Sequence, residues 1–60
     1  MYSLGLSEDH TMYTVLSSTN EVLFTYRYKL QAIDHVTALN RGEEFDPAGK
    51  DYKYIHNNNL

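Results

Sequence analysis

The sequence predicts a small α+β protein: a mostly antiparallel sheet with one helix packed on one face, in the order strand, strand, helix, strand. Three observations lead to this fold class. Residues 12–28 alternate apolar and polar positions around a polar turn, residues 29–40 place apolar side chains at helical spacing, and residues 52–56 are rich in aromatic side chains. A chain of 60 residues has room for a single domain of this kind.

The first eleven residues are either an edge strand or a loosely held arm. Tyr2, Leu4 and Leu6 alternate with small residues, as in a half-buried strand, and a polar turn follows at residues 7–10. An arm is the alternative, because the ends of a domain are often held only weakly. Both interpretations stay open at this point.

Residues 12–28 are expected to form a β-hairpin whose turn contains Ser17 and Asn20. If the turn has two or four residues, pairing brings five side chains onto one face of the sheet, which is the predicted main core face. These are Tyr13, Val15, Val22, Phe24 and Tyr26. A turn with an odd number of residues would move one strand's side chains to the opposite face.

The other face of the hairpin would carry Met12, Leu16 and Leu23. One helix cannot cover both faces of a small sheet. We therefore expect either the N-terminal residues or a second protein molecule to cover these side chains.

The predicted helix spans residues 29–40. Its apolar stripe would consist of Ala32, Ile33, Val36 and Leu39, while four residues would face away: Gln31, Asp34, His35 and Ala38. Gly42 marks the end of the helix, since glycine readily adopts the left-handed conformation that follows a helix. The start is open, because Thr25 could cap a longer helix that includes residues 26–28.

Residues 41–51 are expected to form an acidic loop that turns at Pro47 and Gly49. Residues 52–56 would form the last strand, followed by a polar tail at residues 57–60. The loop carries Glu43, Glu44 and Asp46, which we interpret as a contact surface for a basic partner.

Composition bears on stability and on location. A chain this short buries only about 60% of the surface of its unfolded form, and it contains no cysteine that could cross-link it. Self-association, to a homodimer or a higher oligomer, is therefore expected. No apolar run approaches the roughly 20 residues needed to span a bilayer, and the N-terminus lacks the pattern of a signal peptide. We expect a soluble, cytoplasmic protein.

The sequence contains no pattern typical of an enzyme or a metal site. His10, His35 and His56 do not have the spacing of zinc ligands, and neighbouring helix residues such as Asp34 and His35 do not face each other. We expect no catalytic residue, cofactor, metal or small-molecule substrate. One enzymatic alternative stays open, a subunit that becomes catalytic only when assembled, with Asp34 and His35 at a shared cleft.

Aromatic and basic residues alternate in two places, which raises the possibility of single-stranded nucleic-acid binding. The residues concerned are Tyr26, Arg27, Tyr28, Lys29, Tyr52, Lys53 and Tyr54. The net charge of −3 disfavours contact with a phosphate backbone. Tyrosines that fill a thin core are the preferred interpretation, and nucleic-acid binding is the alternative function.

The favoured hypothesis is a non-enzymatic protein interaction module. Its partner or oligomer interface would include six residues: Met12, Leu16, Leu23, Arg27, Tyr52 and Tyr54. Tyrosine and arginine are enriched at such surfaces.

The stretch MYTVLSSTNEVLFTYRYKLQAIDHVTALN, about half of the chain, resembles the compact hairpin-plus-helix proteins that tailed bacteriophages encode beside their replication or host-takeover genes. The resemblance is one of size and architecture, and no functional residue follows from it. It implies a protein that binds and modulates or inhibits a larger host or viral protein, in the cytoplasm of the host cell.

Overall fold

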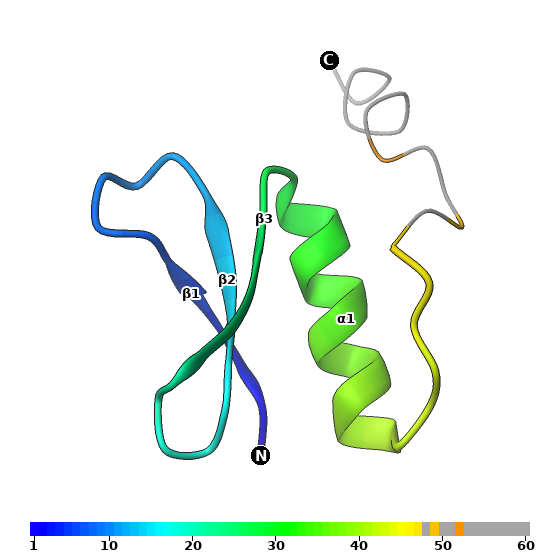
Figure 1. Ribbon diagram of the computed structural model, residues 1–60. Helices are drawn as coiled ribbons and strands as arrows, with labels where there is room; N and C mark the ends of the chain where they lie inside the picture. The colour runs from blue at the N-terminus through cyan, green and yellow to red at the C-terminus, as the bar shows by residue number, and fades with distance from the viewer. Residues whose placement is uncertain (48, 50–51, 53–60) are drawn as a thin grey trace.

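The computed structural model describes residues 1–47, 49 and 52 of the chain (Figure 1). Within these residues the chain forms three strands, β1 (Ser3–Leu6), β2 (Tyr13–Leu16) and β3 (Val22–Tyr26), followed by one helix, α1 (Lys29–Arg41). The strands form an antiparallel sheet in the order β1-β2-β3, and α1 packs against it. The predicted α+β class is confirmed.

The order of the elements differs from the prediction, because the helix follows all three strands. The N-terminal residues supply the additional strand: β1 pairs with β2, so the edge-strand interpretation of residues 1–11 is correct. Residues 53–56 of the predicted last strand lie outside the described residues, as does the predicted tail at 57–60. Tyr52, the first residue of that predicted strand, is helical and buried instead.

The hairpin turn has an odd number of residues. The backbone N–H of Ser17 donates to the carbonyl of Glu21 at 2.9 Å, which leaves three residues between them. Asn20, the last of the three, has φ of 66°. This is the left-handed region that asparagine tolerates better than most residues.

A β-bulge compensates for the odd turn. Val15 pairs with Phe24, but Leu16 pairs with Val22, so Leu23 is an extra residue on β3. Beyond the bulge the predicted register is restored, with Tyr13 opposite Tyr26 and Val15 opposite Phe24. The predicted main core face is therefore correct except at Val22, which shares a face with Leu16 because the bulge displaces it.

The reverse face is partly closed by its own side chains around Gly5. A Cβ atom at Gly5 would lie 2.8 Å from Oγ1 of Thr14 and 2.9 Å from Cδ1 of Leu16, so the absence of a side chain lets these two residues lie across β1. The Thr14 hydroxyl is buried and has no hydrogen-bond partner within the described part of the chain. A buried, unsatisfied hydroxyl costs about 1–3 kcal/mol.

Asp9 organises the connection between β1 and β2. Its Oδ1 accepts hydrogen bonds from the Ser7 hydroxyl at 2.7 Å and from the Thr11 hydroxyl at 2.8 Å, and a longer one from the Thr11 backbone N–H. These bonds favour the carboxylate, so the pKa of Asp9 is lowered.

The two ends of α1 are formed in different ways. At its start Tyr28 has an extended backbone and makes no side-chain cap, so the helix begins at Lys29 and the longer alternative is wrong. At its end Gly42 has φ of 69° and donates to Leu39, while the N–H of Glu43 donates to Ala38. This pair of hydrogen bonds is the Schellman arrangement, as the glycine predicted.

The buried stripe of α1 is rotated from the predicted one. Its buried residues are Ala32, His35 and Ala38, whereas Ile33 is 37% exposed. His35 and Ala38 were expected to face away from the core. The prediction is wrong here because the helix is covered on two sides, by the sheet and by the segment that follows Gly42.

The two completely buried side chains are small. Val15 and Ala32 are completely buried, and Ala38 and Tyr52 are nearly so. At the edge, the Asn40 side chain holds the start of the chain to the end of the helix: its Oδ1 accepts from the backbone N–H of Tyr2 at 2.8 Å, and its Nδ2 donates to the Tyr2 carbonyl at 3.1 Å.

Candidate functional site

Aromatic rings from three parts of the chain meet between the sheet and the helix. Phe24 and Tyr26 come from β3, His35 from α1, and Phe45 from the segment after the helix. The centroid of the His35 ring lies 4.4 Å from that of Phe24 and 4.5 Å from that of Phe45, on which it stacks. Tyr26 contacts His35 and Phe45 edge-on. We call these four residues the aromatic cluster.

His35 is buried within this cluster, and the expectation that it would be an exposed histidine is wrong. Its side chain is 7% exposed, and its Nδ1 lies 2.7 Å from the Tyr26 hydroxyl. Burial lowers the pKa of His35 and raises that of Tyr26. Both groups are therefore neutral at pH 7, and the imidazole tautomer sets which of them donates the hydrogen bond between the Tyr26 hydroxyl and Nδ1.

The segment after Gly42 returns along α1 (Figure 1). Gln31 holds it by a hydrogen bond from Nε2 to the Pro47 carbonyl at 3.1 Å. Farther along, the Tyr52 hydroxyl donates to Oδ2 of Asp34 at 2.8 Å. The helix thus lies between the sheet and a returning segment that is held at Phe45, Pro47 and Tyr52.

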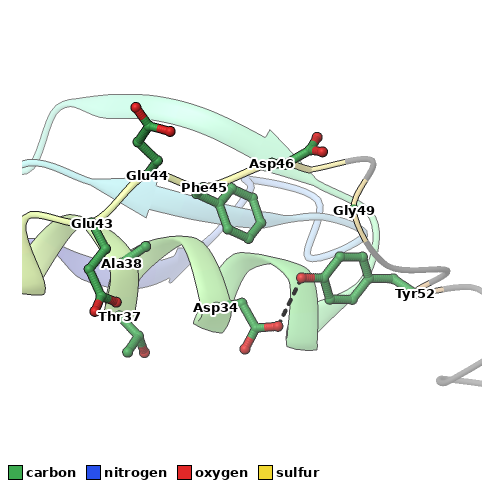
Figure 2. A pocket seen from close by; sticks show the side chains of 9 residues that line it. All are labelled: Asp34, Thr37, Ala38, Glu43, Glu44, Phe45, Asp46, Gly49 and Tyr52. Carbon is green, nitrogen blue, oxygen red and sulfur yellow. Dashed lines mark hydrogen bonds between the residues drawn. The ribbon is translucent and has the colours of Figure 1, made fainter.

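A cleft of about 290 Å³ lies between this segment and α1 (Figure 2). We call it the acidic cleft. It is lined by Asp34, Thr37, Ala38, Glu43, Glu44, Phe45, Asp46, Gly49 and Tyr52. All three residues of the predicted acidic contact loop are among them, and the structure adds a fourth acidic residue, Asp34 on the helix.

Two aromatic side chains belong to the acidic cleft as well. Figure 2 shows the Phe45 ring pointing toward the helix and the Tyr52 hydroxyl facing Asp34. Burial, together with the hydrogen bond to Asp34 and its charge, raises the pKa of Tyr52 to about 12. Tyr52 therefore remains a neutral donor throughout the ordinary pH range.

The cleft does not bring a catalytic pair together. Asp34 accepts from Tyr52, whereas its neighbour His35 bonds to Tyr26 in the aromatic cluster. Asp34 and His35, the two residues expected at the shared cleft of an assembled enzyme, therefore lie in different places: Asp34 in the acidic cleft and His35 in the aromatic cluster. Among the residues described, no group of three His, Cys, Asp or Glu side chains is arranged to hold a metal ion.

The residues of the predicted partner interface differ in their exposure. Met12 and Leu16 are half-buried, Leu23 is 41% exposed and Arg27 is exposed. Tyr52 lies in the interior, where it offers little surface to a partner, and Tyr54 lies outside the described residues. Tyr26 and Tyr52, two members of the predicted nucleic-acid platform, are committed to contacts within the chain.

Sequence reasoning missed Phe45 and the role of β3 as an exposed edge. Phe45 is a lone aromatic residue in an otherwise polar stretch, GEEFDPAG, and this isolation was the available signal. The edge position of β3 follows from the strand order, which required knowing that residues 3–6 pair with the other side of β2.

Comparisons of this chain with protein-family models, with curated protein sequences and with solved structures found no match. Within the described residues, none of the helical structure is both long and apolar enough to cross a membrane.

Proposed function

We propose that this chain is a non-enzymatic protein interaction module whose acidic cleft binds a lysine or arginine side chain of a larger protein. One observation carries the proposal: four acidic residues, three from the returning segment and one from α1, line a single cleft together with the half-buried Phe45. The module would act stoichiometrically, by occupying a surface of its partner.

The chemistry of the cleft suits an organic cation. Carboxylates attract a basic side chain and orient it, and an aromatic ring contributes about 0.5–1 kcal/mol when a cation lies over its face. The net charge of −3 adds long-range attraction for a basic partner. The likeness to phage proteins that modulate host or viral proteins is consistent with this mode of action.

Binding can be tested with a labelled peptide of alternating glycine and arginine, followed by fluorescence anisotropy at low concentrations of the chain. We expect saturable one-to-one binding that weakens as salt is added. Replacing Phe45 with Leu keeps every charge but removes a ring, and it should weaken binding about threefold.

A matched pair of double variants separates the cleft from overall charge. Glu43→Gln with Glu44→Gln removes two negative charges from residues that line the cleft and should weaken binding by about five- to tenfold. Glu8→Gln with Glu21→Gln changes the net charge equally at exposed positions outside the cleft and should leave binding nearly unchanged. Equal weakening by both pairs would mean that only overall charge attracts the peptide, which contradicts the proposal.

A further inference from the structure

The outer edge of β1 carries backbone hydrogen-bonding groups at two residues that are open to a partner. The backbone N–H of Ser7 donates to the Met12 carbonyl at 3.1 Å. Residues of an antiparallel strand alternate between bonding to the neighbouring strand and pointing away from it. Counting back from Ser7 along β1, the N–H and C=O groups of Leu4 and Leu6 therefore point away from β2. Among the described residues, none forms a hydrogen bond with these outward groups.

The Asn40 side chain already occupies the next outward position on this edge. Tyr2 lies two residues before Leu4, and its N–H and carbonyl both bond to the Asn40 amide, at 2.8 Å and 3.1 Å. This pair of bonds is the pair that a residue of a neighbouring antiparallel strand would make. It confirms the direction of the alternation and closes one end of the edge, so that the stretch from Leu4 to Leu6 remains for a partner.

A groove of about 370 Å³ lies beside this stretch, and we call it the edge groove. It is lined by Leu4, Gly5, Leu6, Tyr13 and Lys29. Leu6 pairs with Tyr13, so the side chains of Leu4, Leu6 and Tyr13 lie on the face of the sheet that α1 covers. Leu4 and Leu6 are nevertheless 37% and 54% exposed. An added strand would therefore find both backbone partners and an apolar surface for its own side chains.

The edge groove is positively charged at one end. Tyr13 pairs with Leu6 on one side and with Tyr26 on the other, and Lys29 follows Tyr26 by three residues, so Lys29 belongs to the Leu6 end. Lys29 is exposed, and no carboxylate of the described residues forms an ion pair with it. The start of α1 has neither a side-chain cap nor an acidic residue in its first turn, so its dipole adds positive potential there. A carboxylate complements this end.

We propose that an extended, acidic segment of another protein adds to the outer edge of β1 as a fourth, antiparallel strand. Apolar residues of the segment lie opposite Leu4 and Leu6, and an acidic residue two positions before the one opposite Leu6 reaches Lys29. In this mode of recognition backbone hydrogen bonds supply affinity, and alternate side chains supply specificity. Antiparallel pairing continues the pattern of the sheet and is the more stable kind per residue.

A second copy of this chain fits the edge less well. If Leu4 of the copy lay opposite Leu6, the residue at the position of the acidic side chain would be Tyr2. That residue carries no charge, and its outward groups are already bonded to Asn40. Residues 53–60 of the chain contain no acidic side chain either. The charge at Lys29 therefore favours a segment of a different protein.

This inference goes beyond the proposed function. The edge groove and the acidic cleft share no lining residue, and they attract opposite charges. The two proposals can fail separately, because the peptide that tests the cleft is basic and the peptide that tests the edge is acidic.

Methylation of peptide nitrogens tests the added strand directly. The probe is a fluorescently labelled peptide with the sequence Glu-Thr-Val-Thr-Val-Thr, whose anisotropy is followed as the full chain is added. A residue opposite Leu4 or Leu6 directs its side chain into the edge groove and its N–H toward β1. Methylating both valine nitrogens should therefore weaken binding by about tenfold or more, since two hydrogen bonds are lost. Methylating instead the nitrogens of the two threonines that follow the valines should change binding by less than about twofold, because these point away from β1.

Two variants of the chain test the charge at the end of the groove. Lys29→Met and Arg41→Met remove the same charge from exposed residues of α1, but only Lys29 lines the edge groove. Lys29→Met should weaken binding of the unmethylated peptide by about threefold, and Arg41→Met should leave it nearly unchanged. Circular dichroism should show that both variants are folded.

Four results would overturn the proposal. The first is no saturable binding of the unmethylated peptide with the chain at about 1 mM. The second is equal weakening by the two methylation patterns, or stronger weakening by the threonine pattern, since neither agrees with an antiparallel strand on β1. The third is equal weakening by the two charge variants, which would leave only overall charge. The fourth is a chain that dimerises in sedimentation equilibrium and releases the peptide as it does so, which would assign the edge to a second copy.

Discussion

The ionisation of His35 is coupled to folding. Protonation would place a charge among the rings of Phe24 and Phe45, in a site that burial makes unfavourable for the charged imidazole. The folded state therefore binds this proton only at a pH below the ordinary pKa of 6.5, while the unfolded chain binds it near that value.

Stability should consequently be level above about pH 6.5 and fall as the pH is lowered from there. Between the two pKa values the unfolded state holds more protons, so the slope is positive and cannot exceed about 1.4 kcal/mol per pH unit for one proton. Urea unfolding at several pH values between about 5 and 8 measures it. His35→Gln cannot titrate and should flatten the profile, and an unchanged profile in this variant would show that another group is responsible.

The ionisation of Asp9 has a separate effect on stability. Its carboxyl has a lowered pKa because Ser7 and Thr11 donate hydrogen bonds to it. The stability that the Asp9 carboxylate contributes is therefore present above its ordinary pKa of 3.8 and is lost only as the pH falls below that value. The His35 effect begins as the pH falls below 6.5, and the Asp9 effect begins only below 3.8.

Individual residues were predictable where a simple alternation governs them. The positions of Tyr13, Val15, Phe24 and Tyr26 follow from the two-residue period of a strand. His35 could not be placed in this way, because its burial depends on Phe45, which lies ten residues farther along and belongs to no periodic element. The polar His35 side chain can be buried because it forms a hydrogen bond with the hydroxyl of Tyr26 on β3.

At the level of elements, the end of α1 depends on one backbone conformation. Nothing lies within 4 Å of a Cβ atom built at Gly42, so a substitution there meets no steric obstacle and changes only the cost of the left-handed φ of 69°. Gly42→Ala should therefore lower stability by about 1 kcal/mol. Gly42→Asn should cost less, since asparagine tolerates this region. Denaturant unfolding measures both, and equal stability of all three proteins would contradict the argument.

The elements themselves were largely predictable, and the details of the hairpin were not. The body of the helix, its glycine stop and the hairpin strands have local signals, whereas its start has no side-chain cap to mark it. The three-residue turn shifts the strand register by one residue, and the bulge at Leu23 shifts it back. A regular hairpin with an even turn therefore predicts the correct face for Phe24 and Tyr26, although the real hairpin is irregular. Only Val22, which lies between the turn and the bulge, shows the difference.

At the level of the whole molecule, the returning segment converts two layers into a partly three-layered structure. The sheet and one helix enclose few large side chains. The two residues that are completely buried, Val15 and Ala32, are both small. The segment contributes Phe45 to the aromatic cluster, and its Tyr52 donates a hydrogen bond to Asp34. These contacts hold the segment beside α1 and so form the acidic cleft. Sequence analysis identified the carboxylates of this segment but not its path, because loops carry no periodic signal.

Phe45 should therefore stabilise the entire chain and not only the segment that contains it. Its ring is half-buried and contacts residues of both α1 and β3, so Phe45→Ala should lower the free energy of unfolding by about 2 kcal/mol, and Phe45→Leu by less. Far-ultraviolet circular dichroism and tyrosine fluorescence should report the same shifted midpoint, because the helix and the tyrosines unfold together. Loss of the fluorescence transition alone, with the helix unaffected, would show that the returning segment is held independently of the sheet and helix.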